Sequence, residues 1–141
     1  MNMILPPLPQ IDVANAGFWA SLRTRKLTIQ RCQLCGNWQH YPRLSCVKCM
    51  STEVSFESPE EGGVLHAFTV VHRHPHAAFK ARLPIVVGLV ELTNGIRLMS
   101  QIVDVEPSPD VVKIGMSLDI AFRDVSPEIT VYEFRPAKGE G

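Results

Sequence analysis

The amino-acid sequence predicts a mainly β chain in three parts: an N-terminal helical segment, a small zinc ribbon and a five-stranded barrel. Three observations support this prediction. All four cysteines of the 141 residues fall in two C-x-x-C pairs separated by ten residues. After Gly62, short β-branched runs alternate with Gly, Pro and Asn, and an Asn-Gly turn signal occurs. Before the first pair, apolar residues recur at helical spacing. We expect the parts to occupy residues 1–30, 31–57 and 58–141.

The N-terminal segment is expected to form one helix that ends near Lys26. Asp12 or Asn15 can cap its start, because a short polar side chain accepts hydrogen bonds from the unpaired N–H groups of the first turn. Phe18 and Leu22 lie four residues apart, which places both on one face of the helix.

The candidate metal ligands are Cys32, Cys35, Cys46 and Cys49. Each C-x-x-C can turn two sulfurs toward one point, and two such turns complete a tetrahedral four-thiolate zinc site. Such a site is closed, so zinc is expected to fix the fold rather than to perform chemistry. Two disulfides would need an oxidising compartment, and a thioredoxin-like redox pair would need only one C-x-x-C on a strand-to-helix turn. Structural zinc is the favoured interpretation.

Five strands are expected in the last part: Gly63 to His72, Ile85 to Leu92, Ile96 to Val105, Ser117 to Phe122, and Ile129 to Phe134. Asn94-Gly95 joins the second and third as a tight hairpin. The second is almost continuously apolar, which predicts a central strand packed on both faces, with the N-terminal helix as its candidate cover. Five short strands with one tight hairpin suit a small closed barrel of the OB-fold type.

The segment between the first two barrel strands carries the most chemistry. Its cations are candidates for contacting the phosphates of a ligand such as CoA, because guanidinium and ammonium groups bind phosphate oxygens. These cations are Arg73, Lys80 and Arg82. Alternating histidines suggest a transition-metal site as a second interpretation, although Pro75 interrupts regular pairing there. These histidines are His72, His74 and His76. A solvated loop is the third interpretation.

Three aromatic residues are candidates for contact with a partner: Phe18, Trp19 and Trp38. Each has a second interpretation. Phe18 and Trp19 can pack in the core, or they can offer an apolar face to another protein. Trp38 can pack the small ribbon onto its neighbour, or it can stack on a nucleic-acid base together with Tyr41.

Charge and motif content narrow the class of function. The chain has 14 basic and 14 acidic residues, so it lacks the basic balance typical of a dedicated nucleic-acid binder. No phosphate-binding loop, dinucleotide fingerprint or Gly-x-Ser-x-Gly elbow occurs, so we do not expect catalysis. The start of the chain lacks a secretion signal, and the apolar stretch Leu83–Leu92 is far shorter than the roughly 20 residues of a membrane span. A cytoplasmic protein is expected.

The order of these features resembles a known family. The matching stretches are the Phe18-Trp19 pair, residues 30–36 and 41–49 around the cysteines, residues 63–73, and Phe134-Arg135-Pro136. This order is similar to that of the family called domain of unknown function 35. The resemblance covers nearly the whole chain and implies a rubredoxin-like zinc ribbon followed by an OB-fold.

Members of that family lack evident catalytic machinery and accompany thiolase-like or hydratase-like enzymes of acyl-CoA, sterol and polyketide metabolism. The resemblance therefore implies a non-catalytic accessory subunit that binds a thiolase-like, acyltransferase or hydratase partner and helps to hold acyl-CoA. The competing hypothesis is a single-stranded nucleic-acid binder. The sequence is also compatible with a homodimer.

One departure from the family pattern concerns the second cysteine pair. Gly36 follows Cys35, whereas Met50 follows Cys49 where a glycine is usual. Glycine adopts a positive φ without strain, and methionine does not. The sequence leaves two expectations: zinc held more loosely at the second pair, or a backbone at Met50 that avoids a positive φ.

Overall fold

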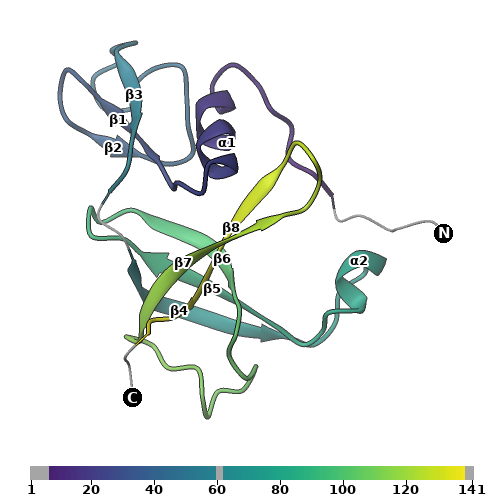
Figure 1. Cartoon of the computed structure of the whole chain (residues 1–141). Coiled ribbons are helices and arrows are strands. Elements are labelled where there is room, and N and C mark those ends of the chain that lie inside the picture. The colour runs from purple at the N-terminus through teal and green to yellow at the C-terminus, as the bar shows by residue number, and fades with distance from the viewer. Residues whose placement is uncertain (1–6, 60–61, 139–141) are drawn as a thin grey trace.

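The structure, a computed structural model, describes residues 7–59 and 62–138 (Figure 1). Helix α1 (Ala16–Arg23) lies beside a small antiparallel sheet, and a closed barrel lies next to both. The small sheet has the order β2-β1-β3 and forms the ribbon. Its strands are β1 (Ile29–Cys32), β2 (Trp38–Gln39) and β3 (Val54–Glu57). The predicted mainly β architecture is confirmed.

The barrel contains five strands in the order β4-β5-β6-β8-β7, and β7 pairs with β4 to close it. The strands are β4 (Gly63–Val71), β5 (Ile85–Glu91), β6 (Arg97–Ile102), β7 (Ser117–Asp124) and β8 (Thr130–Pro136). All neighbours are antiparallel except β6 and β8, which meet in parallel at Ile102 and Phe134. A five-stranded closed barrel confirms the predicted OB-fold. A short helix, α2 (Ala77–Lys80), lies between β4 and β5.

The barrel core consists of side chains that alternate along these strands. Leu65, Val90 and Phe134 are fully buried in it, and Val112, in the connection between β6 and β7, joins the same cluster. Gly88 allows the close approach of β4 to β5, since a Cβ at this position would lie 2.7 Å from the Leu65 side chain. The short β-branched runs between Gly, Pro and Asn, rather than this alternation, made the strands recognisable in the sequence.

The expectation that α1 covers strand β5 is wrong. Val86 and Val90 of β5 point into the core, whereas Val87 and Leu89 point outward and remain partly exposed. Helix α1 packs against β8 instead. The continuous apolar run of β5 therefore combines a core face with an outer face on the β4-β5-β6 side of the barrel, which α1 does not cover.

Helix α1 ends earlier than predicted, at Arg23. Arg25 adopts a positive φ of 63° just beyond the helix and turns its guanidinium to Asp124 at the end of β7. Two hydrogen bonds of 2.7 and 2.9 Å join these side chains and hold the pKa of Asp124 well below its usual value. At the other end, Asp12 and Asn15 exchange backbone-to-side-chain hydrogen bonds of 2.8 and 2.9 Å in the turn before α1. Asn15 is the N-cap residue, but its side chain accepts no N–H group of the helix, so the predicted capping bond is not formed.

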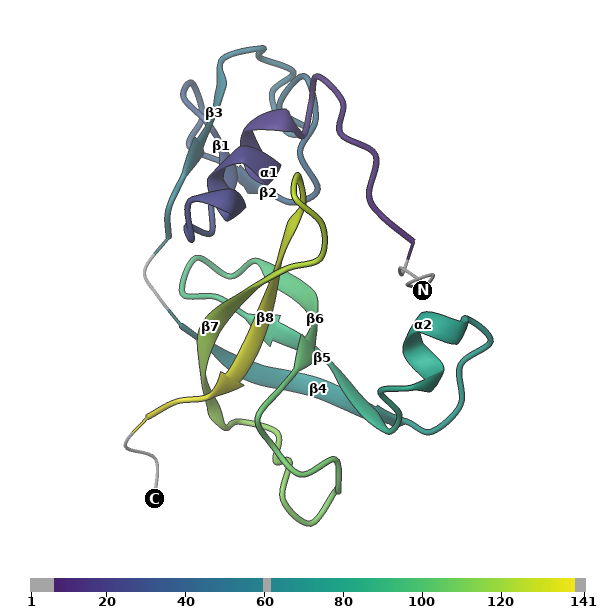
Figure 2. The same cartoon turned by 45° about the vertical axis from the view of Figure 1, so that its right-hand side comes forward.

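Phe18 is the centre of the contact between helix, ribbon and barrel. Its side chain is only 3% exposed, and its ring lies 5.2 Å from that of His40 in the ribbon and 6.2 Å from that of Tyr132 in β8. Figure 2 shows α1 between the ribbon and the tip of the β7–β8 hairpin. The assignment of Phe18 to a partner surface is therefore wrong, because contacts within the chain bury the ring. Trp19 packs edge-on against Phe18 and stays partly exposed, so its partner role remains a prediction.

Neither helix of the described residues has the length and apolar content that crossing a membrane would require.

Acidification tests the buried contact at His40. Burial lowers the pKa of His40 to about 4 from 6.5, since an apolar environment disfavours the charged ring. Below pH 6.5 the unfolded chain binds a proton that the folded chain does not bind until about pH 4. We therefore expect the free energy of unfolding to fall across this window by about 2 kcal/mol, a value reduced from the full shift because the ring is partly exposed.

Urea denaturation at pH values above and within this window provides the measurement, with His40→Phe as the control. Phenylalanine keeps the ring contacts and cannot titrate, and protonation of the cysteines affects both proteins alike. A difference in unfolding free energy between the two proteins that stays constant across the window would contradict the prediction.

Candidate functional site

The four cysteines form a cluster at one end of the ribbon. Their sulfur atoms all lie within 4.8 Å of one another, with Cys32 to Cys49 at 3.5 Å and Cys35 to Cys46 at 3.6 Å. These distances are too long for a disulfide, whose bond is about 2.05 Å. They fit the edges of a tetrahedron around a metal ion with metal–sulfur bonds of about 2.3 Å. Within residues 7–59 and 62–138, no other group of three or more His, Cys, Asp or Glu side chains has such an arrangement.

Backbone N–H groups stabilise the charged form of two of these thiols. The N–H of Cys49 lies 3.5 Å from the sulfur of Cys46, and the N–H of Lys48 lies 3.3 Å from it. Together they lower the pKa of Cys46 to about 6. The N–H of Cys35 similarly lowers the pKa of Cys32. Metals bind the thiolate, and four thiols at these distances fit a metal site closed by four protein ligands.

The two cysteine turns have the same backbone shape although their sequences differ. Gly36 N–H donates to the Cys32 carbonyl at 3.0 Å, and Met50 N–H donates to the Cys46 carbonyl at 2.9 Å. The φ values are +78° for Gly36 and +68° for Met50. The expectation that Met50 avoids a positive φ is wrong, because the hydrogen bond that closes the turn requires this conformation. An L side chain in this region costs about 1 kcal/mol or more.

Two buried glutamines hold the second turn in place. Gln39 donates to the Gln30 side-chain oxygen at 2.6 Å, and its own oxygen accepts the N–H of Val47 at 2.9 Å. Gln30 donates to the carbonyl of Arg43 at 2.7 Å and accepts the N–H of the same residue at 2.9 Å. The ribbon thus uses a satisfied polar network where a larger domain would use an apolar core. The sequence offered no pattern that predicts this pair.

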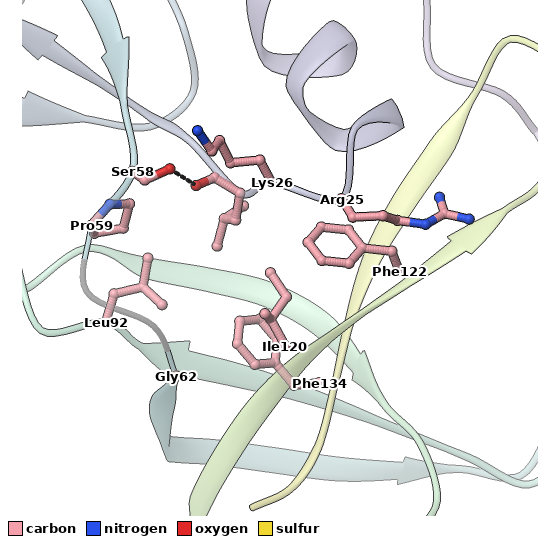
Figure 3. A pocket seen from close by; sticks show the side chains of 10 residues that line it. Arg25, Lys26, Ser58, Pro59, Gly62, Leu92, Ile120, Phe122 and Phe134 are labelled. Carbon is pink, nitrogen blue, oxygen red and sulfur yellow. Dashed lines mark hydrogen bonds between the residues drawn. The ribbon is translucent and has the colours of Figure 1, made fainter.

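A groove lies between the segment after α1, the residues that follow β3 and the barrel (Figure 3). Its volume is about 350 Å³, and Ile120, Phe122 and Phe134 form its apolar floor. Arg25 also lines the groove, but its guanidinium extends away from the floor toward Asp124. Ser58 donates a hydrogen bond to the Leu27 carbonyl at 3.2 Å and ties the linker to the segment that precedes β1. The groove was not predicted from the sequence.

The predicted phosphate-binding cations lie in the connection between β4 and β5. Arg73 and Lys80 are exposed, whereas Arg82 is partly buried and lies 3.8 Å from the carboxylate of Glu133. The buried Glu133 also accepts a hydrogen bond from Arg123 at 3.0 Å. Arg82 is therefore partly engaged within the chain. Figures 1 and 2 place α2 on the opposite side of the barrel from the linker, so these cations and the groove do not form one site.

The alternative of a three-histidine metal site is wrong. The Nδ1 atom of His74 accepts the N–H of His76, and the Nδ1 atom of His76 accepts the N–H of Ala78 and caps α2. These histidines shape the turn before α2 and do not gather around a common point. His66 is exposed at a β-bulge of β4, so it is not a packed residue of the barrel interior.

Trp38 packs the ribbon against the barrel core, as one of its two interpretations predicted. The guanidinium of Arg31 lies 4.9 Å above the ring and contributes a cation–π contact. Tyr41, in contrast, is 69% exposed. Trp38 is thus engaged within the chain, whereas Tyr41 faces solvent. The role of Trp38 toward a partner remains a prediction.

The chain is similar to two domain families and to several known proteins. Residues 19–55 match the family described as "ChsH2, rubredoxin-like zinc ribbon domain", and residues 57–123 match "ChsH2, C-terminal OB-fold domain". A DUF35 domain-containing scaffold protein of Methanothermobacter thermautotrophicus is 36% identical over 112 residues, which cover 78% of this chain and 82% of the relative. The chain belongs to the DUF35 family. The expected zinc-ribbon and OB-fold architecture is thereby confirmed from sequence as well as structure.

One further relative is longer than this chain, and another is a solved structure. A probable enoyl-CoA hydratase alpha subunit of Thermomonospora curvata is 37% identical over 133 residues, or 94% of this chain. The chain spans only 40% of that relative. The solved structure called "Ltp2-ChsH2(DUF35) aldolase" contains a chain that is 36% identical, with a TM-score of 0.81 over 92% of this chain and 98% of that one.

Removal of one cysteine tests the metal cluster. We expect Cys46→Ser to lose the metal and the folded ribbon, because the binding free energy of a structural metal, about 10 kcal/mol or more, is folding free energy. Metal analysis and circular dichroism of the purified protein provide the measurement.

Lys48→Ala, a change in the same turn that leaves every thiol in place, should keep the metal. So should His74→Ala. If Cys46→Ser cannot be purified, a chelator added to the wild-type protein should produce the same loss of structure. A metal-free protein with full stability would contradict the assignment.

Proposed function

We propose that this protein is a non-catalytic accessory subunit that binds a thiolase-like or hydratase-like enzyme and helps to hold its acyl-CoA substrate. The observation that carries the proposal is the likeness, at 36% identity, to nearly the whole length of a chain in the aldolase complex. Relatives named as a hydratase alpha subunit and as a scaffold protein support the same class of function. The closed four-cysteine site has no position for substrate, which supports a structural role for its metal.

Zinc is the metal we propose for the cysteine cluster. Four thiolates in a tetrahedral arrangement suit zinc and also iron, and zinc carries no redox chemistry. A structural ion that fixes the ribbon is sufficient for a subunit whose partner supplies the reacting groups. Metal analysis that finds iron in place of zinc would overturn this assignment.

The proposed CoA contact lies in the connection between β4 and β5. In OB-folds, the loop that joins the first two strands takes part in ligand binding, and here this loop carries three cations. Arg73 and Lys80 are exposed, so their charges are accessible to phosphate groups. Arg82 is shared with Glu133 and contributes less.

The nucleic-acid alternative receives less support from the structure. OB-folds that bind single strands use aromatic side chains on the outer face of their second and third strands. In this barrel the corresponding strands are β5 and β6, and their outer face presents Val87, Leu89 and Met99. Of the proposed stacking residues, Trp38 is already covered by Arg31.

Affinity purification of the tagged chain from its native cell tests the proposed function. We expect a thiolase-like, acyltransferase or hydratase subunit to co-purify in near-equal amount, with mass spectrometry as the measurement. The same preparation should contain no nucleic acid by absorbance. Nucleic acid recovered without such an enzyme, with binding that weakens steeply as salt rises, would favour the alternative.

The CoA contact is tested by replacing Arg73 and Lys80 with Ala. We expect the purified complex to bind a CoA thioester about tenfold more weakly, since two charge-assisted contacts are lost. Isothermal titration gives the affinity, and Lys113→Ala, a change of an exposed lysine in the β6–β7 connection, is the control. An unchanged affinity in the double variant would remove this loop from the ligand site.

A further inference from the structure

A buried carboxylate joins the connection between β4 and β5 to the barrel. The side chain of Glu133, in β8, is only 8% exposed. Its Oε2 atom lies 3.0 Å from Nε of Arg123, on the neighbouring strand β7, and 3.8 Å from a guanidinium nitrogen of Arg82. A carboxylate removed from water needs such partners, because an unpaired buried charge is costly. The pair of Arg123 and Glu133 joins two strands, whereas the pair of Arg82 and Glu133 joins a strand to the connection.

The connection is otherwise a self-contained unit. Figure 2 shows α2 beyond the ends of β4 and β5, away from the ribbon. Among the described residues, the hydrogen bonds that residues 73–81 form have both partners between His74 and Arg82. Within the same described part of the chain, the ion pair of Arg82 with Glu133 is the one that links this connection to a barrel strand. Its position on the barrel therefore depends on Arg82.

Arg82 belongs both to the connection and to its contact with the barrel. Its backbone N–H donates to the carbonyl of Phe79 at 3.0 Å, just beyond α2, while its side chain reaches Glu133. A helix of four residues does not persist without outside contacts, so this contact stabilises the end of α2, where Lys80 is exposed. The ring of Phe79 in turn lies 4.6 Å from that of His74, in the part of the connection that carries Arg73.

We propose that Glu133 is a positioning residue for the CoA contact. Through Arg82 it orders the connection, so that Arg73 and Lys80 are held in place for phosphate groups before the ligand binds. A loop that is already ordered loses less conformational entropy on binding. This inference rests on the proposed function and adds to it a residue that acts through Arg82 and does not itself touch the ligand.

The test compares Glu133→Gln with Arg123→Ala and Glu91→Gln. Glutamine keeps the shape of Glu133 and removes its charge. Arg123→Ala removes the other partner and leaves the contact with Arg82 in place, and Glu91→Gln breaks an exposed ion pair of the same barrel. Hydrogen exchange of the full chain, followed by NMR at the amides of residues 79–82, reports the order of the connection. Isothermal titration of the complex with acetyl-CoA gives the affinity.

We expect Glu133→Gln to raise amide exchange at residues 79–82 about fivefold, and Arg123→Ala and Glu91→Gln to stay within about twofold of the wild-type rate. Added salt should raise this exchange in the wild-type chain and not in Glu133→Gln, because salt screens the ion pair. The affinity for acetyl-CoA should fall about threefold in Glu133→Gln. In an Arg82→Gln background, Glu133→Gln should change neither readout further, since the two residues act as a unit.

Each contrary result has its own meaning. Unchanged exchange in Glu133→Gln, or an equal rise in Arg123→Ala, would overturn the positioning role and leave the proposed function standing. Tighter binding of acetyl-CoA by Glu133→Gln would show that the carboxylate withholds Arg82 from the ligand, and this too would overturn the positioning role. Unchanged affinity when Arg73 and Lys80 are both replaced by Ala would overturn the CoA contact and this inference together, whatever the exchange rates show.

Discussion

The cluster of four sulfur atoms is the constraint on which the N-terminal half of the molecule depends. The ribbon strands are too short to build an apolar core, and the fully buried polar contacts of Gln30 and Gln39 lie where such a core would be. Strand β1 ends at Cys32, and the segment that returns to β3 passes through the second cysteine turn. The glutamine network and a few strand hydrogen bonds hold this segment in place, and a metal that joined the two turns would add the remaining constraint.

An apolar core stabilises the barrel, and two contacts join the barrel to the ribbon. Alternating side chains of its strands fill a core that needs no metal. Phe18 contacts rings of both the ribbon and β8, and Trp38 packs from the ribbon onto the barrel core. The pair of Arg25 and Asp124 is exposed and salt-screened, so it orients the segment after α1 more than it stabilises the fold. The orientation of the ribbon on the barrel thus rests mainly on aromatic contacts.

Features with a local or periodic signature could be predicted from the sequence. The spacing of the cysteines, the Asn94-Gly95 hairpin and the β-branched runs of the barrel strands each reflect neighbours in the chain. The errors concern contacts between distant segments. Nothing near Arg25 indicates that Asp124, 99 residues later, ends the helix segment in a left-handed turn. Similarly, the apolar run of β5 does not reveal whether another element covers its outer face, and the ring of Phe18 looks the same in sequence whether it is buried or exposed.

Met50 illustrates why such departures from an expected pattern are informative. Sequence reasoning treated the missing glycine as a reason for the backbone to change, and the backbone did not change, because the turn is set by the metal ligands and by the hydrogen bond to Cys46. The strain therefore remains in the folded chain, and no packing of the side chain compensates for it. Natural sequences keep local conflicts of this kind mainly where another requirement outweighs stability. The methionine at this position has no explanation in the contacts of the described residues.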